Sequence, residues 1–246
     1  MSPFVAEIIG TMLLVILGDG VVANVLLKQS KGNGGGWIVI TAGWGFAVMV
    51  GAYAVGQISG GHMNPAVTIA FAAAGINDFG WDKVPAYLAG QMIGAFIGAI
   101  VVWLAYLPHW AVTEDKAAVR GVFCTAPAIR KPAANVLCEM IGTFVLVVGV
   151  LAIPSVKNLD PKIGFAAGVG PLLVGFLVWS IGLSLGGPTG YAINPARDLG
   201  PRIAHAILPI PGKTDSDWGY SWVPVIGPII GGVLGALFYK QFWMDV

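Results

Sequence analysis

Charge is what this sequence most lacks: Asp, Glu, Lys and Arg make up 10% of its 246 residues, and the formal net charge is +1. Hydrophobic residues make up 57% of the chain, and its mean hydropathy is +0.81. A soluble protein of this size needs more charged residues to cover its surface. So small a net charge also gives no indication of a nucleic-acid or acidic partner. The sequence therefore predicts a protein embedded in a lipid bilayer.

Cysteine and histidine are also scarce, with two and three residues respectively. Cys124 falls in a polar connection and Cys138 at the start of an apolar segment, so their spacing is not that of a metal site. His62, His109 and His205 are scattered, and no serine–histidine or metal-ligand cluster accompanies them. We expect no metal, no cofactor and no enzymatic activity, and an intramembrane hydrolase has little to support it.

Long apolar segments, by contrast, are abundant. A helix of about 20 apolar residues crosses the ~30 Å hydrocarbon layer of a membrane. Segments of this kind lie near residues 3–27, 37–57, 84–107, 133–153, 164–184 and 221–243. We predict an all-α membrane protein with these six segments as transmembrane helices.

Two shorter apolar segments each begin with the tripeptide Asn-Pro-Ala, at residues 64–66 and 194–196. Asn is a preferred N-cap and Pro is preformed for the first helical turn, so each tripeptide favours a helix start. The helices from Pro65 to about Ala74 and from Pro195 to about Leu208 would cover roughly half of the bilayer at ~1.5 Å per residue. We therefore predict two re-entrant half-helices.

The two halves of the chain resemble each other. Residues 6–11 (Ala-Glu-Ile-Ile-Gly-Thr) match residues 138–143 (Cys-Glu-Met-Ile-Gly-Thr). We interpret this as an inverted repeat of residues 1–107 and 133–246, joined by the loop 108–132 within one domain, 1–246. Because each half has an odd number of spans, the second half enters from the opposite face, and the half-helices can meet at the midplane. Glycines spaced four residues apart are expected to pack helices closely: Gly90, Gly94, Gly98, Gly227, Gly231 and Gly235.

Two opposed helix N-termini at the membrane centre would present unpaired N–H groups and partial positive charge, which repel cations, protons included. Asn64 and Asn194 can cap their helices through oxygen and keep NH₂ groups for a passing hydroxyl or water. Non-helical backbone at this depth is tolerated where it lines a cavity. The preceding carbonyl groups are therefore expected to form an acceptor ladder: Gly60, Gly61, His62, Met63, Gly190, Tyr191, Ala192 and Ile193. Such a tube suits small neutral molecules with hydroxyls on one edge.

With two Asn-Pro-Ala motifs, an inverted repeat and Arg197 three residues after Asn194, the chain resembles the aquaporin and glycerol-facilitator family over nearly its whole length. The resemblance implies an aquaporin-like bundle with a selectivity filter of Trp44, Gly182, Tyr191 and Arg197. Trp44 is the residue of glycerol facilitators, and Gly182 stands where water-specific members usually have His. Tyr191 departs from the pattern, because the well-known glycerol facilitators have Phe there.

In this filter the indole and phenol rings would form an apolar corner for a carbon backbone, while the guanidinium donates to hydroxyls. We predict a passive channel for glycerol, with water and related small polyols as further solutes. A facilitator of protonated small acids such as lactic acid and a water-preferring pore are alternatives in the same class. A coupled secondary transporter is the alternative in another class, since it also has inverted repeats and broken helices.

Three carboxylates fall within apolar spans, where an ionisable group is functional by default and a proton relay is one interpretation. The matched positions of Glu7 and Glu139 and the family resemblance favour a supporting role, in which each accepts hydrogen bonds from backbone N–H groups of an irregular pore segment. Asp19 has no role that the resemblance assigns. Its position is compatible with an extracellular vestibule or with tuning the passage of weak acids.

The resemblance also implies a homotetramer in the plasma membrane, with one pore per protomer and cytoplasmic termini. In that orientation the outer connections carry seven Lys and Arg residues and the inner side four lysines, so the positive-inside rule favours the opposite topology. The inner lysines are Lys83, Lys157, Lys162 and Lys240.

Overall fold

The computed structural model describes residues 1–155, 158–159 and 164–243, so Lys157 and Lys162 lie outside the described residues. Within these ranges the chain is helical and contains no strand. The helices are α1 (Pro3–Leu26), α2 (Trp37–Ser59), α3 (Pro65–Ala74), η1 (Ile76–Asp78), α4 (Val84–Ala105), α5 (Leu107–Val112), α6 (Lys116–Phe123), α7 (Pro132–Ala152), α8 (Gly164–Leu185), α9 (Pro195–Ile207) and α10 (Val223–Trp243).

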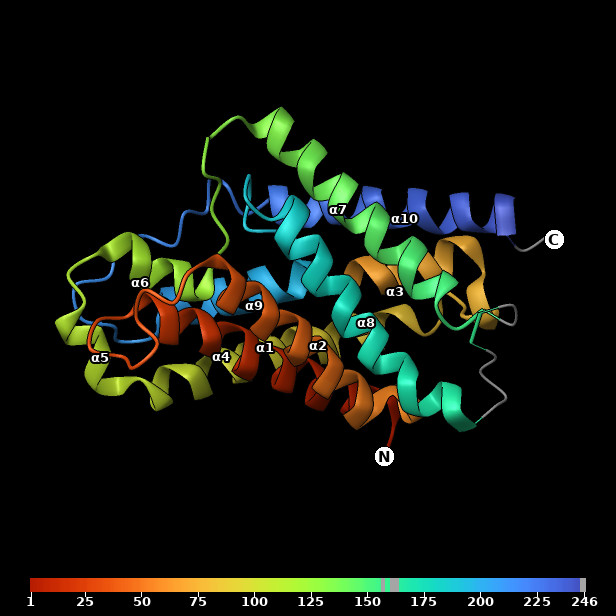
Figure 1. The fold of residues 1–246 in the computed structure, drawn as a ribbon, viewed down its shortest axis with the longest axis horizontal. Coiled ribbons are helices and arrows are strands. Elements are labelled where there is room, and N and C mark those ends of the chain that lie inside the picture. The colour runs from red at the N-terminus through yellow and green to blue at the C-terminus, as the bar shows by residue number, and fades with distance from the viewer. Residues whose placement is uncertain (156–157, 160–163, 244–246) are drawn as a thin grey trace.

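Six of the described helices are long and apolar enough to cross a membrane: α1, α2, α4, α7, α8 and α10. They run along the long axis of the molecule (Figure 1). The prediction of an all-α membrane protein with six spans is confirmed, and the helix ends differ from the predicted ones by a few residues. The last span, for example, begins at Val223 because Trp218 to Trp222 form turns.

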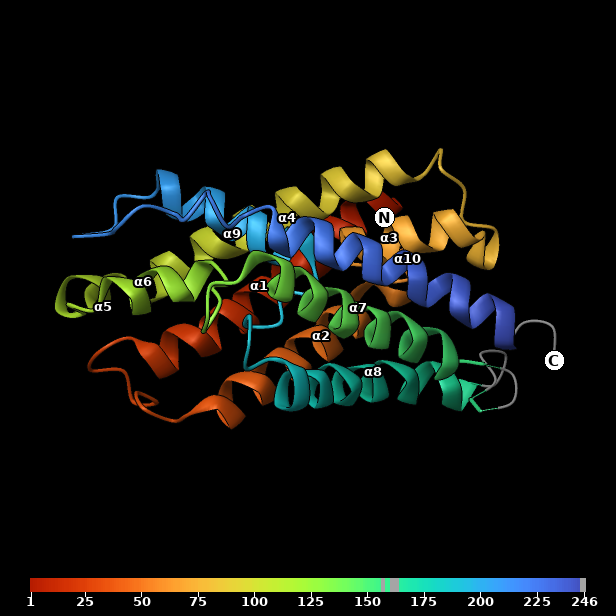
Figure 2. The same cartoon turned by 90° about the horizontal axis from the view of Figure 1, so that it is seen from above.

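The two half-helices have 10 residues in α3 and 13 in α9. At ~1.5 Å per residue they are about 15 and 20 Å long, too short to cross a ~30 Å hydrocarbon layer. In Figures 1 and 2, α3 lies in the half of the molecule that holds the start of α1 and the end of α10, and α9 lies in the other half. The half-helices therefore approach the middle from opposite ends.

Helix pairing follows the repeat. Helix α1 packs on α4 and α7 packs on α10, and each half-helix packs against the last span of the other half, α3 on α10 and α9 on α4. Every glycine of the two predicted ladders lies against a backbone carbonyl of its partner helix, where a Cβ would collide with the oxygen. In ladder order these carbonyls belong to Phe4, Ile8, Met12, Val136, Met140 and Phe144. The close approach that small residues allow is thus used in both halves.

The connection from residue 108 to 132 differs from the predicted loop, because it contains α5 and α6. Asp115 caps α6, and its Oδ1 accepts hydrogen bonds from the N–H groups of Ala117 and Ala118 at 2.9 and 3.0 Å. Helix α6 buries Val119, Val122 and Phe123 and packs on α1 and α9. The polar composition of the connection hid a short helix that has one apolar face.

Candidate functional site

One cavity of about 1210 Å³ lies between the two halves. Its lining contains both half-helix caps, Asn64 and Asn194, and three of the four predicted filter residues, Trp44, Tyr191 and Arg197. The predicted ladder residues that line it are Gly60, Gly61, His62, Met63, Tyr191, Ala192 and Ile193. The structure therefore brings most of the predicted site together in one space, but it leaves Gly182 and Gly190 out of the lining.

Each asparagine side chain is hydrogen-bonded to the backbone carbonyl just before the other asparagine. Asn64 Oδ1 accepts from the N–H of Ala66 at 2.8 Å, and Asn194 Oδ1 accepts from the N–H of Ala196 at 3.0 Å. Asn64 Nδ2 donates to the carbonyl of Ile193 at 2.8 Å, and Asn194 Nδ2 donates to the carbonyl of Met63 at 2.7 Å. Each NH₂ group thus donates one hydrogen bond to the opposite half, and its second hydrogen can donate to a molecule in the cavity.

The segment before α3 has an irregular, non-helical backbone. Gly60, Gly61 and Met63 have φ values of 82°, 63° and 48°, in the left-handed region. Backbone of this kind can turn neighbouring N–H groups to one side, where they converge on an anion. That anion is Glu7, fully buried in α1, whose carboxylate accepts from the N–H groups of His62 at 3.1 Å and Met63 at 2.7 Å.

Two side chains complete the coordination of the Glu7 carboxylate. Ser59 Oγ donates to Oε1 and Gln91 Nε2 donates to Oε2, each at 2.6 Å. Gln91 also donates to the hydroxyl of Thr68 in α3 at 2.9 Å. A buried carboxylate that accepts four hydrogen bonds is well compensated for its burial.

The segment before α9 repeats the arrangement in a simpler form. Gly190, Tyr191 and Ile193 have φ values of 79°, 37° and 41°. Glu139 in α7 accepts from the N–H groups of Ala192 at 3.0 Å and Ile193 at 2.8 Å. Because both carboxylates hold the N–H side of these segments, the carbonyl side is left to the cavity that the segments line.

The four predicted filter residues form two contacting pairs. The guanidinium of Arg197 stacks on the Trp44 ring, with Cζ 4.0 Å from the ring centroid. Gly182 lies behind Tyr191, and a Cβ added there would be 2.8 Å from Tyr191 Cζ. The missing side chain at position 182 therefore makes room for the tyrosine ring, which occupies part of the space that Gly182 was expected to open.

Two supporting residues of this region escaped the sequence analysis. The Trp37 indole N–H donates to the Gly182 carbonyl at 3.0 Å, and its ring meets the Tyr191 ring edge-on at 5.9 Å. Gly18 of α1 lies against the Trp44 ring, where a Cβ would overlap it. The position of Trp37 near a span end is typical of an interface anchor, and nothing local in the sequence indicates its contact with position 182.

A buried ion pair fixes the loops around α9. Arg202 Nε donates to Asp198 Oδ1 at 2.7 Å, and both side chains are fully buried. Asp198 Oδ2 accepts from the N–H of Thr125 at 2.8 Å, and Arg202 donates to the carbonyls of Thr125 and Ser216. In the same loop region, a hydrogen bond with the Asp217 carboxylate raises the pKa of the Arg130 guanidinium. The connections before α7 and after α9 are thereby joined to the half-helix.

The end of α8 carries a sequence pattern that also occurs in serine hydrolases. Residues 182–186 read Gly-Leu-Ser-Leu-Gly, the spacing of a serine-hydrolase nucleophile elbow. That elbow is a strand-to-helix turn, whereas these residues lie at the end of α8, and Ser184 is exposed on its outer side. The pattern therefore has neither the backbone context nor the pocket that nucleophilic catalysis needs.

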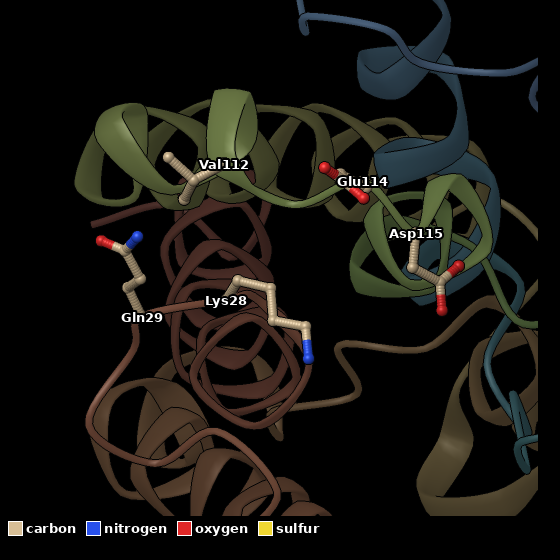
Figure 3. A pocket seen from close by; sticks show the side chains of 5 residues that line it. All are labelled: Lys28, Gln29, Val112, Glu114 and Asp115. Carbon is tan, nitrogen blue, oxygen red and sulfur yellow. The ribbon is translucent and has the colours of Figure 1, made fainter.

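A second, open hollow of about 510 Å³ lies at the loop end of α1, α5 and α6 (Figure 3). Lys28 and Gln29 come from the chain after α1, Val112 is the last residue of α5, and Glu114 and Asp115 come from the connection between α5 and α6. Among the described residues, no group of three His, Cys, Asp or Glu side chains could hold a metal ion. The hollow shares no lining residue with the central cavity.

Comparison with known proteins agrees with this geometry. Residues 1–239 match the family described as major intrinsic protein. The probable glycerol uptake facilitator protein of Thermotoga maritima is 66% identical over 240 residues, which cover 98% of this chain and 99% of the relative. The glycerol uptake facilitator protein of Bacillus subtilis is 60% identical, covering 98% and 84% respectively. The X-ray structure of the aquaglyceroporin from Plasmodium falciparum superimposes with a TM-score of 0.84 and 31% identity, covering 97% of this chain and 95% of that one.

Proposed function

Because the chain belongs to the major intrinsic protein family, we propose that it is a passive channel whose main solute is glycerol, with water and related small polyols as further solutes. Its relatives at 60–66% identity are named as glycerol uptake facilitators. Glycerol facilitators of this family are channels rather than enzymes, and the protein is an integral membrane protein. The family and the six spans support the class of channel, and the names of the relatives support glycerol as the solute.

The observation that carries the proposal is the stack of Arg197 on Trp44 beside Tyr191 in the cavity wall. The two aromatic rings offer an apolar surface to the carbon backbone of a polyol, and the guanidinium edge offers donors to its hydroxyls. Solute hydroxyls then meet the backbone carbonyls of the segments that Glu7 and Glu139 hold. A polyol can exchange its hydration shell for these contacts one hydroxyl at a time.

The centre of the channel is assigned to Asn64 and Asn194. Their free amide hydrogens donate to one oxygen of the permeating molecule, while the half-helix N-termini behind them carry partial positive charge. A cation at this point meets that charge without an acceptor to replace its hydration shell. We therefore assign proton and metal-ion exclusion to the meeting point of α3 and α9.

The same family membership supports a proposal for the assembly and the location. We propose a homotetramer in the plasma membrane with one pore per protomer, surrounded by lipid, with both termini in the cytoplasm. The start of α1 and the end of α10 lie in the same half of the molecule, as an even number of crossings requires (Figure 1). Fusion of a reporter to the C-terminus, with accessibility measured in intact cells, tests the orientation.

Stopped-flow light scattering on proteoliposomes in a glycerol gradient tests the solute. We expect re-swelling faster than in empty vesicles by about tenfold or more, as for a pore that lowers the barrier by over ~1.4 kcal/mol. Equal rates in the two vesicle preparations would exclude a glycerol channel. A panel of water, glycerol, dihydroxyacetone, urea and lactic acid at two pH values ranks the solutes, and a higher rate for lactic acid or water would transfer the proposal to those solutes.

A coupled transporter is separated from a channel by accumulation. A proton-coupled carrier needs a titrating carboxylate on the solute path, whereas Glu7 and Glu139 are 0% and 2% exposed and are occupied by backbone N–H groups. We expect radiolabelled glycerol to equilibrate across proteoliposomes under an imposed proton gradient. Accumulation above the external concentration would favour the carrier.

A further inference from the structure

Asp19 is the buried carboxylate that the proposed function does not use. It lies in α1, has no exposed surface, and neither of its oxygens has a hydrogen-bond partner among the described residues. A carboxylate without partners in this environment is strongly unfavourable unless an opposite charge compensates it. The nearest such charge is Arg197, whose Nη1 lies 3.7 Å from Asp19 Oδ1.

Arg197, in turn, depends on this carboxylate. Its Nη1 is buried and makes no hydrogen bond within the described part of the chain, and its guanidinium contacts the Trp44 ring and Asp19. The neighbouring carboxylate, Asp198, is taken up by Arg202 and Thr125. Asp19 is therefore the counter-ion that remains for the filter arginine.

Asp19 lies next to a residue of α1 that contacts the proposed filter. It follows Gly18, the residue whose lack of a side chain admits the Trp44 ring. A single turn of α1 thus supports both members of the stack, the ring by close approach and the guanidinium by charge. Both side chains of the pair are shielded from solvent, with the arginine side chain 8% exposed and the aspartate 0%.

The repeat provides an internal comparison. Counted from the matched glutamates, the second-half position that corresponds to Asp19 is Leu151. Counted from the matched asparagines, the first-half position that corresponds to Arg197 is Val67. Both residues line the cavity. The two charged positions are apolar together at the other end of the cavity. This correlated difference is expected if the carboxylate and the guanidinium form one unit.

We propose that Asp19 is a positioning residue for solute selection: it holds the Arg197 guanidinium over the Trp44 ring and compensates its charge. The proposal rests on the proposed filter role of Arg197 and extends it to a residue behind the pore wall. Without the carboxylate, the guanidinium keeps one ring contact and is free to rotate into the cavity. Glycerol, which needs the donors and the aromatic corner together, is more sensitive to this rotation than water is.

The functional test compares Asp19→Asn with Thr11→Val. Thr11 lies two turns away on α1, is fully buried, and its hydroxyl has no partner, so its replacement controls for a general disturbance of the helix. We expect Asp19→Asn to lower the glycerol-to-water permeability ratio about fivefold, ~1 kcal/mol by RT ln 5. Thr11→Val should leave the ratio as in the unaltered protein. An unchanged ratio in Asp19→Asn would overturn the proposal.

Chemical labelling reads the guanidinium directly. Phenylglyoxal modifies accessible arginines, and mass spectrometry of the Arg197 peptide measures the rate. We expect Asp19→Asn to increase labelling of Arg197 at least about threefold, because the ion pair no longer protects it, while Arg202, paired with Asp198, stays protected in both proteins. Equal labelling of Arg197 with and without the Asp19 carboxylate contradicts the proposal.

Thermal unfolding in two backgrounds separates positioning from a merely structural role. In the unaltered protein, Asp19→Asn leaves a buried cation uncompensated and should lower the unfolding midpoint. In the Arg197→Val background there is no cation to compensate, so the same change should not lower it. An equal loss in both backgrounds would overturn the pairing. Labelling and unfolding remain informative even if the protein conducts no glycerol, so this proposal and the proposed function can fail separately.

Discussion

The two half-helices begin identically and then diverge. Each starts with an Asn cap, Pro and Ala, but α3 continues with Val67 and Thr68 where α9 continues with Arg197 and Asp198. The common part places the two caps against each other through the Met63 and Ile193 carbonyls. The divergent part makes one end of the cavity charged and the other apolar. The repeat thus preserves the residues that join the two half-helices, and the proposed filter arginine occurs in one half alone.

The two carboxylate supports differ as well. Glu7 accepts four hydrogen bonds, two from the backbone and two from the side chains of Ser59 and Gln91. Glu139 accepts two backbone bonds, from Ala192 and Ile193. The side chains of Ser59 and Gln91 support Glu7, whereas Glu139 has Thr189 at the position that matches Ser59 and no counterpart of the Gln91 bond among the described contacts. Substitutions at matched positions should therefore have unequal effects.

The largest difference is expected between Glu7→Gln and Glu139→Gln. Glutamine turns one carboxylate oxygen into an NH₂ group that faces the existing donors. At Glu7 this disrupts two bonds and at Glu139 one, and bonds to a charged group contribute about 1.5–3 kcal/mol each. We expect roughly 3–6 kcal/mol of destabilisation for Glu7→Gln and about half of that for Glu139→Gln, measured by denaturant unfolding in micelles. Equal losses of stability would show that Glu7 and Glu139 stabilise their pore segments to the same extent.

Removal of the charge at Asp198 should come next. Asp198→Asn leaves the buried Arg202 guanidinium without a counter-ion, a change that costs about 3–5 kcal/mol when one partner of a buried pair is removed. The matched residue of the first half is Thr68, which donates to the Asn64 carbonyl at 3.1 Å. Thr68→Val removes neutral hydrogen bonds and should cost about 1–2 kcal/mol. Thermal unfolding of both variants measures the two losses of stability. A larger loss for Thr68→Val than for Asp198→Asn would contradict the expected difference between the halves.

Local chemistry explains which parts of this site the sequence predicts. The caps Asn64 and Asn194 were predictable because an Asn-Pro pair specifies a helix start from neighbouring residues alone. Glu7 and Glu139 were predictable because the repeat marks them as a pair. In each case the signal lies within a few residues or in the register of the two halves.

Other parts depend on contacts between distant segments. The Asp198 carboxylate meets Thr125, 73 residues away, and Trp37 meets Gly182, 145 residues away. Neither contact has a local pattern, so neither was predicted. Asp19 shows the same limit, since its charge was visible in the sequence but its partner Arg197 lies at the other end of the chain.

A smaller difference is expected between the two caps. Asn194 Oδ1 accepts from the N–H groups of Ala196 and Arg197, whereas Asn64 Oδ1 accepts from Ala66 alone. Loss of an N-cap costs about 0.5–2 kcal/mol. We expect Asn194→Ala near the upper end of that range and Asn64→Ala near the lower end, read from unfolding midpoints. The reverse order would mean that the cross-link to the Met63 or Ile193 carbonyl outweighs capping.

The smallest effect is expected at Tyr191, where the halves differ by a whole side chain. The matched first-half residue is Gly61, and both have positive φ, 63° for Gly61 and 37° for Tyr191. The Tyr191 hydroxyl is buried without a partner among the described residues, while the ring is held against Gly182 and Trp37. Tyr191→Phe removes that hydroxyl and should change stability by less than about 1 kcal/mol, with a gain more expected than a loss.

Solute flux through the same variant shows whether the tyrosine hydroxyl takes part in selection. The ring alone supplies the apolar corner, so glycerol flux in Tyr191→Phe should stay within about twofold of the unaltered protein. Tyr191→Gly, which copies the first half, removes the ring and should lose the preference for glycerol over water. Because both variants act at one position, their contrast separates hydroxyl from ring. A large fall in glycerol flux in Tyr191→Phe would mean that the hydroxyl bonds to the solute, and selection would then rest on two polar groups rather than on Arg197 alone.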